Sequence, residues 1–152
     1  MKSPGPAAVD RVRSGFSSHS IKAGLAYFAL VFGAGFVLGS IRVPFLVPRF
    51  GERVAELVEM PIMFIVILIS ARFIVRRFFL PPDVRTRLGA GLLALGLLLA
   101  AEVLLAVVLQ DRTLGEYVAS RDPVSGTVYL AMLALFAVMP LVLARVASAS
   151  DV

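Results

Sequence analysis

Long uncharged blocks separated by short polar segments dominate the hydrophobic pattern of this chain. Each block falls inside a longer stretch that we read as one helix. The predicted helices cover residues 21–41, 52–79, 84–110 and 123–146. About 20 mostly apolar residues are enough for a helix to cross the hydrocarbon of a membrane. The pattern therefore predicts an all-α, integral membrane four-helix bundle built from two helical hairpins.

The two ends of the chain differ from this helical region. Residues 1–20 are rich in Ser, Pro, Gly and Ala, which predicts a flexible polar and basic N-terminal tail. Residues 21–147 form the predicted transmembrane domain, and residues 148–152 form a short C-terminal tail. The first apolar block is longer than the core of a signal peptide and ends without a small-residue cleavage site. We therefore expect an uncleaved signal anchor.

Prolines and short polar residues mark the expected breaks between helices. Residues 42–50 contain Pro44 and Pro48, each of which disfavours helix at the residue before it, so we expect an extended interfacial loop. Pro61 removes a backbone donor inside the second predicted helix and predicts a bend there. Two of the expected helices begin with an aspartate that can act as an N-cap, and a further pair has capping-box spacing. These residues are Asp83, Asp122, and the pair Thr113 and Glu116.

The distribution of basic residues predicts how the chain is oriented. Of the 15 Lys and Arg residues, most fall on the cytoplasmic side if the N-terminus is cytoplasmic. The basic residues left on the far side are Arg42, Arg49, Arg53, Arg112 and Arg121. We therefore expect both termini in the cytoplasm. The expected partners are the lipid bilayer and anionic lipid head groups on the cytoplasmic side.

Composition excludes several classes of protein. Of the 152 residues, 59% are hydrophobic and 16% are charged, so the helices leave no room for a soluble catalytic domain. The net charge of +5 does not point to nucleic acid, because the basic residues flank apolar blocks. The chain has no cysteine, and its one histidine, His19, lies in the tail. No zinc-protease, serine-hydrolase or phosphate-loop motif occurs. We expect no catalytic residue, no metal site and no cofactor.

Polar residues at one depth are the strongest candidate for a site. Counted inward from the outer ends of their helices, Glu59 and Glu102 lie roughly 9 to 12 Å below the outer boundary. Tyr129 of the last helix falls at a similar level. Acidic groups at this depth destabilise a membrane helix unless they find partners.

The expected partners are nearby on the second helix and the loop before it. Glu56 shares a helix face with Glu59, and Arg42 and Arg53 are the closest cations in the sequence. One interpretation is an outward-facing polar pocket that binds a cation, a proton or a polar head group. The other is a salt-bridge cluster that fixes the register of the helices. The residues alone leave both open.

Small residues on the first helix predict a packing face. Gly35 and Gly39 form a GxxxG pair, in which missing side chains let another backbone approach closely. The partner could be a second copy of the chain or another helix of the same bundle, and we favour the latter.

Two segments carry a resemblance to a known group of proteins. RVPFLVPRFGERVAELVEMPIM and EYVASRDPVSGTVYL resemble segments of small, uncharacterised bacterial inner-membrane proteins with four predicted helices. The resemblance covers nearly the whole chain after the N-terminal tail. It implies a bacterial origin, the inner membrane and a four-helix plan, and it carries no activity.

These patterns favour a non-catalytic function. The first hypothesis is an accessory or interaction subunit of a membrane-protein complex or homo-oligomer. The alternative is a small transporter or channel-like subunit with an outward-facing acidic site at Glu59 and Glu102. A water-filled cavity reaching Glu102 would favour transport, whereas a dry and fully paired cluster would favour the accessory role.

Overall fold

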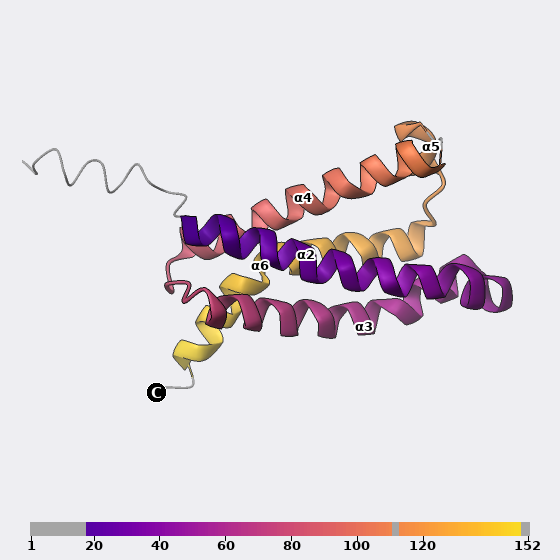
Figure 1. Ribbon diagram of the computed structural model, residues 1–152. Coiled ribbons are helices and arrows are strands. Elements are labelled where there is room, and N and C mark those ends of the chain that lie inside the picture. Colours follow the sequence, from indigo (N-terminus) through magenta and orange to yellow (C-terminus); the bar gives the residue numbers. More distant parts are fainter. Residues whose placement is uncertain (1–17, 111–112, 150–152) are drawn as a thin grey trace, which may run out of the picture.

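The computed structural model describes residues 18–110 and 113–149. These residues form helices and contain no strand, so the prediction of an all-α chain is confirmed. The helices, shown in Figure 1, are α2 (Ser18–Ile41), η1 (Arg42–Leu46), α3 (Val47–Arg77), α4 (Val84–Gln110), α5 (Leu114–Ala119) and α6 (Pro123–Ala149). Most of both predicted tails lies outside the described residues. Residues 18–20 and 148–149, expected in the tails, are helical.

Three helical stretches are long and apolar enough to cross a membrane. They are Ser18–Arg77, Val84–Val108 and Pro123–Val146. The first has 60 residues, far more than the roughly 20 that one crossing needs. It contains both α2 and α3, and α3 runs back alongside α2, as Figure 1 shows.

The segment that joins α2 to α3 is helical, so the expectation of an extended loop at residues 42–50 is wrong. A π-helical turn, η1, continues from α2 directly into α3. Pro48 lies in the first turn of α3, where a backbone amide has no helical acceptor and proline is therefore tolerated. The break falls instead at Gly51, with φ 79° and ψ 163°. Glycine alone adopts this conformation readily because it has no Cβ.

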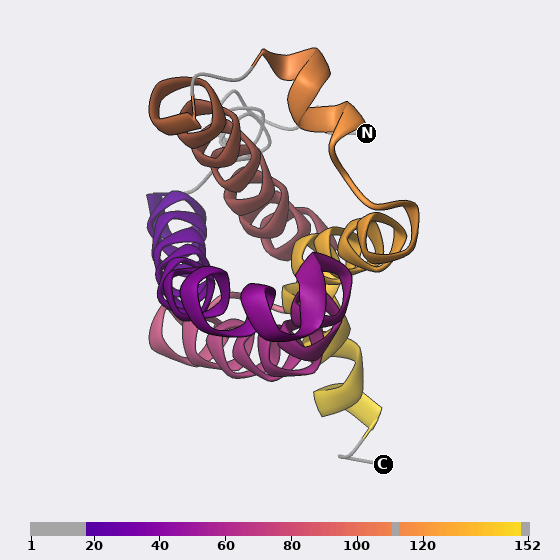
Figure 2. The ribbon, with the colours of Figure 1, turned by 90° about the vertical axis from the view of Figure 1, so that its right-hand side faces the viewer.

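The long helices surround a common centre. α2 packs against α3 and α4, and α6 packs against the same two helices. Viewed along the helices in Figure 2, the order around the bundle is α2, α3, α6, α4. α2 and α6 therefore face each other across the bundle, and only large side chains can join them.

Tyr27 and Phe136 make this connection. Their rings stack with centroids 4.4 Å apart, and both residues are buried. The Tyr27 hydroxyl also donates to the Phe136 carbonyl oxygen at 2.9 Å. In a regular helix the backbone N–H of residue 140 would donate to this carbonyl, but Pro140 has no N–H. A side chain of α2 thus replaces the hydrogen bond that α6 lacks.

Close backbone contacts lie near the same level. A Cβ placed on Gly91 of α4 would lie 1.9 Å from the carbonyl oxygen of Ala137, and one placed on Gly24 of α2 would lie 3.0 Å from that of Ala90. Glycine at both positions lets α4 approach α2 and α6 closely. These contacts join α2, α4 and α6 into a tight core.

The GxxxG pair lies away from this core. A Cβ on Gly35 would meet Met63 at an ordinary 3.5 Å, and one on Gly39 would meet nothing within 4 Å. We expected close packing inside the chain at these two residues, but the close approaches are at Gly24 and Gly91 instead.

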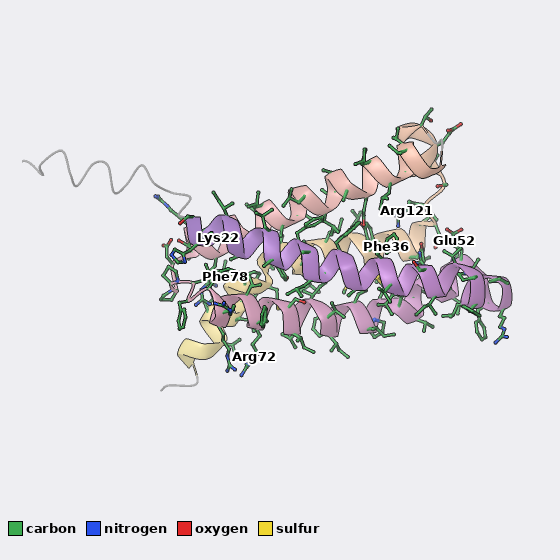
Figure 3. The ribbon with its side chains drawn as sticks, viewed as in Figure 1. Lys22, Phe36, Glu52, Arg72, Phe78 and Arg121 are labelled. Carbon is green, nitrogen blue, oxygen red and sulfur yellow. The ribbon has the colours of Figure 1, made fainter. Side chains whose placement is uncertain are left out.

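Arg87 holds together the end of the bundle at which α3 passes into α4. Its guanidinium donates to the carbonyl oxygens of Leu80, Pro81 and Pro140, at 3.0, 2.8 and 3.3 Å. The side chain is buried, so its charge is solvated by these carbonyls rather than by water. We call this the Arg87 end, and the opposite end, which carries η1 and α5, the Arg42 end. In Figure 3, Lys22, Arg72 and Phe78 lie near the Arg87 end, and Glu52 lies toward the Arg42 end.

Helix starts follow the expected capping. The backbone N–H of Thr86 donates to Asp83 Oδ2 at 3.0 Å at the start of α4. Thr113 and Glu116 exchange side-chain and backbone hydrogen bonds at the start of α5. The predicted N-cap and capping box are confirmed at both sites.

Replacing Tyr27→Phe keeps the ring stack but leaves the Phe136 carbonyl without a donor. We expect a loss of about 0.6–1.7 kcal/mol, measured by SDS-driven unfolding in mixed micelles. Pro140→Ala restores a backbone N–H at position 140, so Tyr27→Phe should be less destabilising in that background. An equal loss of stability in both backgrounds would contradict the idea that the Tyr27 hydroxyl replaces the missing backbone N–H at position 140.

Gly91→Ala should destabilise the bundle by about 1–3 kcal/mol, because the new methyl group meets backbone that cannot move independently of α6. Gly96→Ala is the matched control on the same helix, since nothing lies within 4 Å of a Cβ there. It should be neutral or stabilising by up to about 1 kcal/mol through helix propensity. The same unfolding assay measures both variants, and similar values for the two would disprove the close α4–α6 contact.

Candidate functional site

A cleft of about 670 Å³ lies between the long helices in the half of the bundle toward the Arg42 end. α2, η1, α3, α4 and α6 all contribute to its wall, as does the residue before the cap of α6. Figure 3 shows two of its lining residues, Phe36 and Arg121, near this end. Its charged or phenolic lining residues are Arg42, Glu56, Glu59, Glu102, Arg121 and Tyr129.

Arg42 is the centre of the first polar group. Its Nη1 lies 3.4 Å from Glu56 Oε1, and its Nε lies 3.2 Å from Glu59 Oε2. Glu56 and Glu59 are three residues apart on α3, so both carboxylates reach the same guanidinium on η1. The side chain of Glu56 is 9% exposed. Burial is possible because the opposite charge is in contact.

The contact between Arg42 and Glu59 is an ion pair without hydrogen-bond geometry. Arg42 Nε and Glu59 Oε2 are both buried, and neither has a hydrogen-bond partner among the described residues. A buried donor or acceptor without a partner destabilises a protein by about 1–3 kcal/mol. One donor and one acceptor beside the cleft thus retain hydrogen-bonding capacity.

The second polar group joins α4 to α6. The Tyr129 hydroxyl donates a short hydrogen bond to Glu102 Oε2. The Arg121 guanidinium carbon lies 4.6 Å from the centroid of the Tyr129 ring, which is a cation–π contact. Arg121 Nη1 also lies 4.0 Å from Glu56 Oε1. Arg121 therefore connects the two polar groups.

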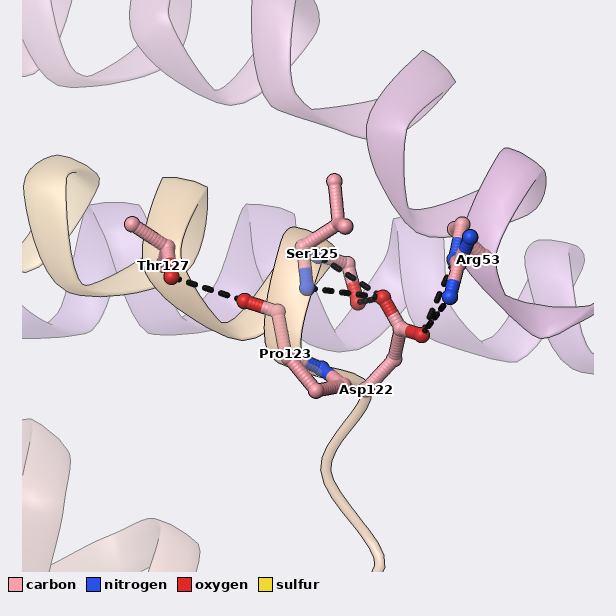
Figure 4. Close-up of polar contacts among 6 residues, drawn as sticks. Arg53, Asp122, Pro123, Ser125 and Thr127 are labelled. Atoms are coloured by element: carbon pink, nitrogen blue, oxygen red, sulfur yellow. Dashed lines mark hydrogen bonds and ion pairs between the residues drawn. The ribbon is translucent and has the colours of Figure 1, made fainter.

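Arg53 and Asp122 form a separate pair outside the lining of the cleft. Arg53 donates to Asp122 Oδ1 through Nε at 2.9 Å and Nη2 at 2.5 Å, as Figure 4 shows. The other carboxylate oxygen accepts from the backbone N–H of Val124 and Ser125, each at 3.0 Å. Asp122 is thus the expected N-cap of α6 and also fastens that helix to α3. The hydrogen bonds from Arg53, together with those from the backbone, lower the pKa of Asp122 to about 2.

Apolar side chains form the rest of the cleft. Met60, Met63 and Met132 line its wall, and methionine adapts to ligands of different shape because its side chain is unbranched. Ile67 and Phe136 line it as well and belong to the buried core around Tyr27. The cleft therefore ends at this core instead of continuing to the Arg87 end.

The structure brings together most of the residues singled out in the sequence. Arg42, Glu56, Glu59, Glu102 and Tyr129 all line the cleft, and Gly35 and Gly39 border it. Arg53 does not, because it pairs with Asp122.

Sequence reasoning missed the part played by Arg121. It lies eight positions before Tyr129, a distance of about two helical turns. Arg121 precedes the cap residue Asp122, so we predicted that it lies in the outer loop before α6. The spacing to Tyr129 was the available signal.

Neither a metal-binding group nor a similar protein indicates what the cleft does. Among residues 18–110 and 113–149, no three His, Cys, Asp or Glu side chains are grouped closely enough to hold a metal ion. Comparisons with protein-family models, with curated proteins and with solved structures gave no match to this chain. The function must therefore be argued from the cleft.

Asp122→Asn should separate the two roles of this side chain. Asparagine caps a helix about as well as aspartate, so the variant loses mainly the ion pair with Arg53, while Asp122→Ala loses both. Asp122→Ala should therefore lower the melting temperature, followed by circular dichroism in detergent, more than Asp122→Asn does.

The pH dependence of the same variants follows from the lowered pKa of Asp122. The ion pair stabilises the fold above the ordinary aspartate pKa of 3.8, and this stabilisation is lost as pH falls toward about 2. The difference in melting temperature between wild type and Asp122→Asn should be constant at neutral pH and shrink below about pH 4. A difference that does not change with pH would contradict the ion pair.

Proposed function

We propose that this protein is a non-catalytic integral membrane protein that binds a small molecule in an outward-facing cleft, as a small transporter subunit does. The observation that carries the proposal is the cleft of about 670 Å³, which has ion-paired acids and arginines on one part of its wall and apolar side chains on the rest. Ligand sites are typically concave, mostly apolar and supplied with a few polar groups, with volumes of about 300–1,000 Å³.

The same proposal includes four membrane crossings, by α2, α3, α4 and α6. It is supported by the return of α3 alongside α2, since each of these helices is longer than the roughly 20 residues that one crossing needs. A cytoplasmic location of both termini follows from the positive-inside rule, because the exposed Arg72, Arg76 and Arg77 lie at the end of α3. These arginines would contact anionic head groups. The bacterial inner membrane is proposed from the sequence resemblance.

The accessory role is the second hypothesis from the sequence, and the polar cluster supports it less well. That role requires a dry cluster in which every charged group is satisfied. Arg42 Nε and Glu59 Oε2 are buried without hydrogen-bond partners, and Glu102 lines an open cleft. These features favour a site that is completed by a ligand or by water.

A continuous channel is also less well supported than a binding cleft. The cleft ends at Ile67 and Phe136, which belong to the apolar core. Close approaches at Gly24 and Gly91 hold the helices together near the level of that core. Movement of a solute to the other side would require these contacts to open, which is typical of a transporter that alternates between two states.

Single cysteines can test whether the cleft opens to water on the outer side, because the chain has no cysteine of its own. Met132→Cys places a thiol in the cleft wall, and Met139→Cys places one on the same helix in the buried core. A membrane-impermeant methanethiosulfonate applied to the outer face of right-side-out vesicles should modify Met132→Cys at least tenfold faster.

The result separates the two proposals for this protein. Equal and slow labelling at both positions would indicate a dry cluster and overturn the binding cleft in favour of the accessory role. Fast labelling of Met132→Cys only in inside-out vesicles would overturn the proposed orientation while leaving the cleft intact.

A further inference from the structure

We propose that the ligand of the cleft is a lipophilic cation, meaning a molecule that carries one positive charge on an apolar body. This inference rests on the binding function proposed above and specifies its ligand class. It is carried by three features of the cleft: the balance of its charges, the aromatic and methionine side chains in its wall, and its size.

The charged groups of the cleft do not balance. Three carboxylates, those of Glu56, Glu59 and Glu102, face two guanidinium groups, those of Arg42 and Arg121. Arg53 does not change this balance, because it lies outside the lining and pairs with Asp122. With all groups ionised the lining has an excess of negative charge, and a site within a membrane stabilises a ligand that neutralises it. A cationic ligand does so, whereas an anionic ligand would add to the excess.

The carboxylates that line the cleft have few cations to share. Arg42 is shared between Glu56 and Glu59, and it meets Glu59 as an ion pair without hydrogen-bond geometry. Across the cleft, Tyr129 donates to one oxygen of Glu102. Charge on Glu59 and Glu102 is thus only partly compensated by protein groups. Glu59 of α3 and Glu102 of α4 both line the cleft, so a positive centre within it is attracted by acids from two helices.

The apolar wall fits the body of such a ligand. Phe32, Phe36 and Phe136 line the cleft, and aromatic side chains attract cations as well as apolar groups. The three methionines add an adaptable apolar surface. A volume of about 670 Å³ accommodates a drug-sized organic molecule. It is far larger than a bare metal ion requires, and the described acids are not grouped for metal coordination.

The probe for this proposal is tetraphenylphosphonium, with tetraphenylborate as a control of matched size and opposite charge. Both are measured by equilibrium dialysis against the full chain in nanodiscs of zwitterionic phosphatidylcholine, after subtraction of binding to empty nanodiscs. We expect saturable binding of tetraphenylphosphonium and no saturable binding of tetraphenylborate. Saturable binding of both, or of the borate alone, would overturn the proposal without the need for any variant.

Charge variants locate the binding. Glu59→Gln and Glu102→Gln should each weaken tetraphenylphosphonium binding at least tenfold. Glu52→Gln is the matched control, because Glu52 is an exposed glutamate of α3 outside the cleft lining. It should change the affinity less than twofold. Equal effects of Glu52→Gln and Glu59→Gln would show a general surface-charge effect and would overturn the assignment.

The cation could enter from the bilayer as an amine-bearing lipid or from the aqueous side as a soluble compound. Mass spectrometry of organic extracts distinguishes these sources. An amine-bearing lipid that is retained by the wild type and lost from Glu59→Gln would indicate that the ligand enters from the membrane. A wild-type protein that retains no lipid but binds tetraphenylphosphonium would indicate that the ligand enters from the aqueous side. An acidic lipid retained through Arg42, and lost from Arg42→Gln, would overturn the cationic ligand.

The ligand class and the proposed function can fail separately. Fast outward labelling of Met132→Cys without tetraphenylphosphonium binding would leave an open cleft with a different ligand. Slow labelling of that cysteine would remove the cleft itself, and with it both proposals.

Discussion

The hydrogen bond from Tyr27 to the carbonyl oxygen of Phe136 is the interaction on which the rest of the structure depends. Proline at position 140 leaves this carbonyl without a donor from its own helix, and hydrocarbon offers no water to replace it. The donor comes from another helix, which places α2 opposite α6 at one level. α4 can then approach both through Gly24 and Gly91. Tight packing at this level leaves the Arg42 end of the bundle wider and provides the cleft with a floor.

The polar residues of the cleft follow a different constraint. Arg42 serves two glutamates at once, and Arg121 contacts both Glu56 and the ring of Tyr129. No carboxylate in the cleft has an arginine to itself. Burial of charge in a membrane requires such sharing when acids outnumber bases, and it leaves the cluster responsive to a further positive charge. The Arg53–Asp122 pair, by contrast, is complete and fastens α6 to α3 at the rim.

Much of this arrangement could be predicted from the sequence, because helix length and the depth of polar residues follow from counting along the chain. Counting placed Glu59, Glu102 and Tyr129 at one level, and they line one cleft. The pairing of each arginine with its acid, however, does not follow from counting along the chain. Arg53 and Arg42 are both near Glu56 in sequence, yet the turn through η1 and Gly51 brings Arg42 to the acids and directs Arg53 to Asp122. The helical form of residues 42–50 was missed in part because a proline tolerated in a first helical turn, as Pro48 is, looks the same in sequence as a proline in a loop.

The bond between Tyr27 and Phe136 also has a consequence for the order in which the chain assembles. Its two residues are 109 positions apart, so the donor is synthesised long before the acceptor. Until α6 meets α2, one carbonyl in the middle of α6 has no hydrogen bond, and the helix is least stable on its own at that point. α6 leaves the ribosome after α2, so α2 is already available to receive it. If the order of synthesis were reversed, α6 would stand in the bilayer without a donor for the Phe136 carbonyl until α2 was made. The tyrosine lies in the earlier of the two helices and the proline in the later one, an order that matches the direction of translation.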